Sequence, residues 1–67
     1  MSLWAVSARV ARMQGYPEDA IWHDLPTFYL DDAVQGFVTL EGALKVAEDV
    51  IDPHGDAVDM SITVVPA

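Results

Sequence analysis

The sequence predicts a small α+β domain in which one helix packs on one face of a three-stranded sheet. Three observations support this fold class. Apolar residues alternate with polar ones near both ends of the chain, helical spacing of apolar residues is confined to residues 40–51, and turn-forming residues separate the segments. The length of 67 residues suits a single domain, so we expect residues 1–67 to fold as one unit.

The first expected strand spans residues 3–13, where the side chains alternate with a period of two. Trp4, Val6, Ala8 and Val10 share one face, while Ala5, Ser7, Arg9 and Ala11 share the other. Turn chemistry at residues 15–17 then ends the strand. This pattern predicts a strand with one buried face.

The second expected strand begins just after Pro26, because proline has no N–H to donate to a sheet. Thr27, Phe28 and Tyr29 favour strands, and Asp31 marks the end of the segment. Residues 20–22 add at most a short edge piece. We therefore expect one strand here, over residues 27–30.

The helix is expected to begin at Thr39, whose hydroxyl can cap the first turn, and to end at Pro53. Its apolar stripe consists of Leu40, Ala43, Leu44, Ala47, Val50 and Ile51. A final strand follows over residues 58–64, where Val58, Met60, Ile62 and Val64 alternate with polar residues.

These elements predict a ββαβ topology in two layers, with an antiparallel or mixed sheet of strand order 2-1-3. A single helix covers only one face of the sheet. The other face would be left open and would carry Leu3, Ala5, Arg9, Ala11 and Met13 beside Ser61 and Thr63, with Arg9 close enough to pair with Asp59. We expect this open face, together with Trp22, to be a protein interface.

The charge is strongly acidic and unevenly distributed. Three basic and eleven acidic residues give a net charge of −8, and residues 1–17 contain two arginines but no acid. Direct binding to nucleic acid is therefore not expected, because phosphates attract basic surfaces. The simplest interpretation is a solvated acidic surface. An alternative is an acidic face that imitates nucleic acid, formed by Glu41, Glu48 and Asp52.

The residue types present argue against several kinds of chemistry. The absence of cysteine excludes thiol nucleophiles and cysteine-based zinc sites, and the scattered glycines form no phosphate-binding loop. Asp52, His54, Asp56 and Asp59 form the densest ligand cluster, but their spacing does not match a calcium-binding EF-hand loop. We therefore expect no enzyme activity, no cofactor and no metal.

No stretch of the sequence has the length and composition of a membrane span or the order of a secretory signal. We expect a protein of the cytoplasm that does not bind a membrane.

The segment from Trp22 to Val38 contains the pattern W-x-x-L-P-T-F-Y-L-D…V-Q-G, and an acidic helix follows it. This pattern resembles small accessory proteins of actinobacterial phages, of the mycobacteriophage type, over about half of the chain. The resemblance implies an accessory protein acting in the host bacterial cytoplasm, and it transfers no catalytic residue.

The leading hypothesis is a non-enzymatic protein–protein interaction module. It would bind a host or phage protein and form a homo-oligomer, most simply a dimer, through the open sheet face or an edge strand. The alternative hypothesis is an acidic decoy that mimics nucleic acid and occupies a DNA- or RNA-binding protein.

Overall fold

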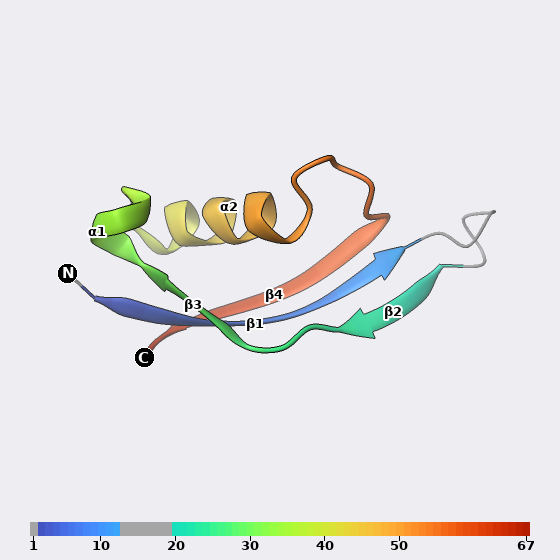
Figure 1. Cartoon of the computed structure of the whole chain (residues 1–67), viewed down its shortest axis with the longest axis horizontal. Coiled ribbons are helices and arrows are strands. Elements are labelled where there is room, and N and C mark those ends of the chain that lie inside the picture. Colours follow the sequence, from blue (N-terminus) through green and yellow to red (C-terminus); the bar gives the residue numbers. More distant parts are fainter. Residues whose placement is uncertain (1, 13–19) are drawn as a thin grey trace.

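A four-stranded sheet carries one long helix on one of its faces (Figure 1). The computed structural model describes residues 2–12 and 20–67. In chain order the elements are β1 (Leu3–Arg12), β2 (Ile21–Asp24), β3 (Phe28–Asp31), α1 (Asp32–Gln35), α2 (Leu40–Ile51) and β4 (Asp59–Pro66). The predicted α+β class, with an antiparallel sheet and one main helix, is confirmed.

Strand β1 lies at the centre of the sheet and pairs antiparallel with each of the other three strands. Along one edge, β2 pairs with residues 9–12 of β1 and β3 pairs with residues 3–6. Along the other edge, β4 pairs with residues 4–11. The prediction of three strands was wrong, because the second strand is divided into two.

The division occurs at Leu25, Pro26 and Thr27. Leu25 still donates its backbone N–H to the carbonyl of Ala8 at 3.0 Å, but Pro26 has no N–H with which to continue the pairing. The chain therefore leaves β1 after Leu25 and rejoins it at Phe28. The sequence suggested only a short edge piece at residues 20–22, whereas Ile21–Asp24 forms a strand.

Both helices begin at capping side chains. The Asp31 carboxylate accepts the N–H groups of Ala33 and Val34 at the start of α1, which the sequence analysis did not predict. Thr39 caps α2 as predicted, since its hydroxyl accepts the Gly42 N–H at 3.0 Å. Between the helices, Gly36 has a φ of 75°, a left-handed conformation that favours glycine.

The core lies between α2 and the sheet. Its buried residues are Val6, Leu30, Phe37, Ala43, Ala47 and Val64. Trp4 closes one end of this core, where its ring meets that of Phe37 edge-on with centroids 6.2 Å apart. The fully buried Ala43 and Ala47 present little bulk, which allows α2 to approach the sheet closely.

The helix stripe differs from the predicted one at both ends. Leu40 and Val50 are each 52% exposed, although their spacing placed them in the buried stripe. Phe37 and Val46 instead pack in or against the core. The reason is that Leu40 and Val50 lie near the two ends of α2, while the tightest packing occurs at its middle.

Candidate functional site

The face of the sheet opposite α2 has no covering layer in the part of the chain that the structure describes (Figure 1). Residues directly opposite each other on paired strands share a face, so the strand register defines this surface. The open face comprises Leu3, Ala5, Ser7, Arg9 and Ala11 of β1, Trp22 and Asp24 of β2, Tyr29 and Asp31 of β3, and Asp59, Ser61, Thr63 and Val65 of β4.

One end of the open face is mostly apolar. Ala5 lies opposite Tyr29 on one side and Val65 on the other, and Leu3 lies two residues further along β1. Tyr29 is 61% exposed, Leu3 52% and Val65 48%. Large apolar side chains gathered in this way on a sheet face are typical of a contact surface.

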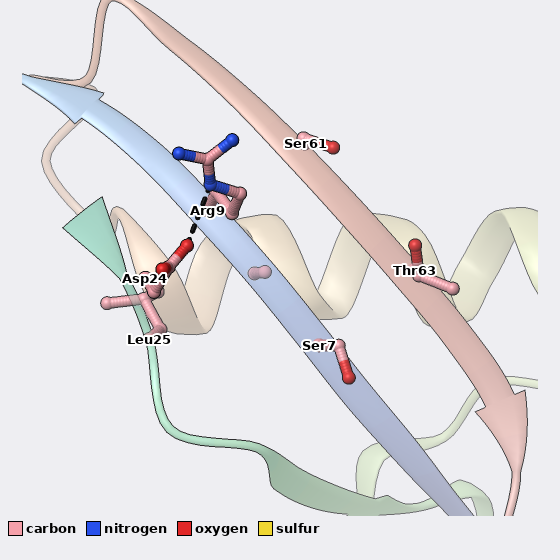
Figure 2. A pocket seen from close by; sticks show the side chains of 7 residues that line it. Ser7, Arg9, Asp24, Leu25, Ser61 and Thr63 are labelled. Carbon is pink, nitrogen blue, oxygen red and sulfur yellow. Dashed lines mark hydrogen bonds and ion pairs between the residues drawn. The ribbon is translucent and has the colours of Figure 1, made fainter. Parts of the chain in front are cut away.

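The middle of the open face is a polar hollow of about 360 Å³, shown in Figure 2. The hydroxyl-bearing side chains of Ser7, Ser61 and Thr63 line it together with Arg9 and Asp24. The hollow extends to Asp24 and Leu25, beside the break between β2 and β3.

Arg9 is held by β2. Its Nε donates to the Asp24 carboxylate at 2.7 Å, and its guanidinium carbon lies 5.5 Å from the centroid of the Trp22 ring. The expected pairing of Arg9 with Asp59 is therefore wrong. Asp59 lies opposite Ala11, two residues beyond Arg9 on β1, and its carboxylate accepts the N–H of Met60.

The predicted interface residues differ in how accessible they are. Leu3 is half exposed and Ala5 partly buried, and the Trp22 side chain, 41% exposed, lies beside Arg9. Ala11, in contrast, is only 2% exposed, so it offers no contact surface. Met13 lies outside the described residues.

The open face provides hydrogen-bonding groups but no arranged catalytic group among the described residues. None of the hydroxyls of Ser7, Ser61 and Thr63 makes a hydrogen bond to a histidine or a carboxylate in this part of the structure. Activation of a serine or threonine nucleophile requires such a base. The described surface combines an apolar end with a polar centre.

The predicted acidic face is only partly presented to solvent. Glu41 and Glu48 are exposed on α2, and Lys45 pairs with Asp49 at 3.9 Å on the same helix. The side chain of Asp52, however, is only 6% exposed. Two of the three predicted acidic residues are thus available to a partner.

Asp52 organises the turn after α2 instead. Its two carboxylate oxygens accept the N–H groups of Asp56 at 2.9 Å and Ala57 at 2.8 Å. The Ala57 bond lowers the pKa of Asp52 most, with further lowering from the Asp56 bond and from Arg12, whose guanidinium lies 3.9 Å away. Arg12 also donates to the last carbonyl of α2, at Ile51, where a cation is favourable.

The cluster of Asp52, His54, Asp56 and Asp59 is not assembled as a metal site. Among the described residues, no group of three or more histidine, aspartate or glutamate side chains is positioned to hold an ion. The Asp52 carboxylate is engaged by backbone donors, so it serves the turn, and His54 is exposed.

Asp32 plays a similar structural role at the start of the sheet. It accepts the Ser2 N–H at 2.9 Å and the Trp4 indole N–H at 3.4 Å. The Ser2 bond is the main cause of a lowered pKa at this carboxyl group. Asp32 thereby fastens the beginning of β1 to α1.

Four residues of the open face were not predicted from the sequence: Asp24, Tyr29, Asp31 and Val65. Their places follow from the register of β2, β3 and β4 against β1. The period of two could have placed Tyr29 and Val65, but Asp24 falls in a strand that the sequence signalled only weakly.

Comparison of the chain with protein families, with curated proteins and with solved structures gives no match. Within the described residues, no helix has both the length and the apolar character needed to span a bilayer.

Proposed function

We propose that this chain is a non-enzymatic, phage-type accessory protein that acts as a protein–protein interaction module. It associates with a second copy of itself and binds a host or phage protein in the bacterial cytoplasm. One observation carries the proposal: α2 covers one face of the sheet, while the open face exposes Leu3, Tyr29 and Val65.

The size of the domain supports this proposal. A chain of about 60 residues buries only about 60% of the surface that its unfolded form exposes, and association with another chain buries more. Two surfaces offer themselves for contact between copies: the open face and the outer edge of β4. The copy-to-copy contact needs one of them, which leaves the other for a different protein.

Sedimentation equilibrium from low to high micromolar concentration tests self-association. We expect a concentration-dependent dimer of the full chain. A chain that remains monomeric at high micromolar concentration would remove the self-association that the proposal requires.

Binding of another protein is tested by capture from bacterial lysate with matched variants. Leu3→Ser combined with Tyr29→Ser removes the apolar end of the open face, while Val38→Ser changes a residue that is 97% exposed and lies between the helices. We expect a captured protein to be lost with the double variant and kept with Val38→Ser. Equal capture by both variants would contradict a role for the open face.

The acidic decoy is a second candidate, favoured by the exposed Glu41 and Glu48 on α2. Binding of this kind weakens steeply as salt rises, because it depends on exposed charges. A bound protein whose affinity is unchanged between low and high salt would exclude the decoy and favour the apolar contact.

A further inference from the structure

We infer that the outer edge of β4 pairs antiparallel with the same edge of a second copy, in a register centred on Thr63. This inference rests on the proposed function, because it names the surface through which two copies associate. It is carried by the positions along β4 at which backbone donors remain free.

The strand register identifies those donors. Ala67 donates its N–H to Leu3, so the odd-numbered residues of β4 turn their N–H and carbonyl groups toward β1. The even-numbered residues turn theirs away from it. The backbone groups of β1 alternate in the same way. The carbonyl of the even-numbered Ala8 points away from β4 and accepts the N–H of Leu25 on the opposite edge.

Only two of the four outward positions have a free donor. The Met60 N–H already donates to the Asp59 carboxylate at 2.8 Å, and Pro66 has no N–H. Ile62 and Val64 remain, and within the described residues β4 pairs with no strand other than β1. An edge strand with free donors is a template for pairing with another chain.

A two-fold axis at Thr63 satisfies both donors of each copy. In this register Ile62 lies opposite Val64 of the second copy, and each of these residues both donates and accepts. Met60 then lies opposite Pro66, so the two positions without a free donor face each other. A shift of the register by two residues in either direction would place Val64 opposite Met60 or Ile62 opposite Pro66. The carbonyls of Met60 and Pro66 can accept, but their N–H groups are engaged or absent, so these pairs would form one hydrogen bond in place of two.

The side chains also match in this register. On the helix face Ile62 meets Val64, and on the open face Thr63 meets Thr63 of the second copy, both of which are favourable cross-strand pairs. The only charged residue of β4 is Asp59, at its first position, so the middle of the contact is uncharged. This matters for a chain with a net charge of −8.

The helices would meet above the joined strands. The helix α2 lies closest to β4, and neighbouring strands are about 4.8 Å apart. A two-fold axis through the outer edge of β4, perpendicular to the sheet, therefore places the two copies of α2 side by side on the same face of the joined sheet.

The opposite edge of the sheet is less suited to pairing. It consists of β2 and β3, which have four residues each and are separated at Pro26. Both strands end in an aspartate, Asp24 and Asp31. Short, interrupted and charged edges resist strand addition, whereas β4 offers eight continuous residues.

Engineered disulfides test the register, because the natural chain has no cysteine. In the inferred pair the two Thr63 Cα atoms lie about 4.5 Å apart, a distance that a disulfide spans, whereas the two Ser61 Cα atoms lie roughly 14 Å apart. We expect Thr63→Cys to form an intermolecular disulfide under mild oxidation at least about tenfold faster than Ser61→Cys. Non-reducing electrophoresis measures both rates.

Ser61→Cys is the matched control, since it lies on the same strand and the same face as Thr63. Equal rates for the two variants would overturn the register. A third variant, Thr63→Cys with Leu3→Ser and Tyr29→Ser, should cross-link as fast as Thr63→Cys alone. A loss of cross-linking in this variant would show that the copies meet through the open face, which overturns the edge pairing.

The two proposals fail in different ways. If the natural chain forms a dimer in sedimentation but Thr63→Cys does not cross-link, the β4 edge is wrong and self-association stands. If the natural chain is a monomer at high micromolar concentration, self-association itself fails.

Discussion

Asp32 and Asp52 are carboxylates that the fold uses to hold backbone N–H groups. The largest cause of the lowered pKa is the Ser2 bond for Asp32 and the Ala57 bond for Asp52. A carboxyl group whose pKa is lower in the folded state stabilises the fold at a pH above the unfolded pKa. That stabilisation is lost as the pH falls through the ordinary value of 3.8 toward the lower folded value.

Replacement of Asp52 by Asn should therefore lower the melting temperature at neutral pH. The difference from the natural chain should shrink progressively as the pH falls below 3.8, because the unfolded chain then takes up a proton at Asp52 and the advantage of the charged carboxylate in the folded state is lost. Thermal unfolding followed by circular dichroism from neutral pH to pH 3 measures this effect. Asp56→Asn, in the exposed part of the same turn, serves as the control and should change the melting temperature little. A constant difference for Asp52→Asn across the pH range would contradict the structural role of its charge.

The Arg9–Asp24 ion pair lies at the surface, with the two side chains 58% and 81% exposed. Exposed pairs of this kind contribute about 0.2–1 kcal/mol, since water screens them. A double-mutant cycle of Arg9→Gln and Asp24→Asn, measured by urea unfolding, should give a coupling free energy within that range. A coupling above about 2 kcal/mol would mean that the pair is shielded from solvent, as a covered open face would make it.

At the scale of elements, the boundaries are set by single residues with a clear physical role. Thr39 begins α2, Pro26 divides β2 from β3, and Gly36 ends α1 with a positive φ. Thr39 could be identified from the sequence because a capping side chain followed by an apolar stripe is a local signal. The helix α1 could not, because four residues carry too little periodicity to indicate a helix.

Thr39→Ala should destabilise the chain by about 1 kcal/mol, because the Gly42 N–H loses its acceptor. Thr39→Ser keeps a hydroxyl and should retain most of the stability. The free energy of unfolding in urea compares the two variants. Equal destabilisation by Ala and Ser would indicate that the Thr39 methyl group, and not its hydroxyl, is what matters.

At the scale of the whole molecule, a net charge of −8 accompanies a sheet face and a strand edge that no described part of the chain covers. The net charge of −8 opposes the approach of two copies, and salt screens that repulsion over a Debye length of about 10 Å at 0.1 M. The inferred contact itself is uncharged along most of β4. The net charge of each copy therefore opposes self-association, while the uncharged contact along β4 favours it.

Dimerisation should accordingly strengthen as sodium chloride rises from low to moderate concentration. Sedimentation equilibrium at several salt concentrations gives the dissociation constant directly. Binding to a basic protein through Glu41 and Glu48 would show the reverse trend. A dimer that weakens with salt would point to ion pairs between the copies and would contradict an uncharged contact.

The sequence by itself determined the α+β class, the central position of the first strand, the start and end of the long helix, and the apolar alternation of the last strand. These features follow from local periodicity and capping chemistry, which act over a few neighbouring residues.

Only the tertiary structure decided which partner each of these residues meets. Arg9 pairs with Asp24 and not with Asp59, and the Asp52 carboxylate accepts backbone N–H groups of the turn that follows α2. Neither outcome could be predicted from the sequence, because register and burial depend on contacts between distant segments. The free donors of Ile62 and Val64 likewise follow from the pairing of β4 with β1, since the direction of an N–H in a strand is fixed by its neighbour.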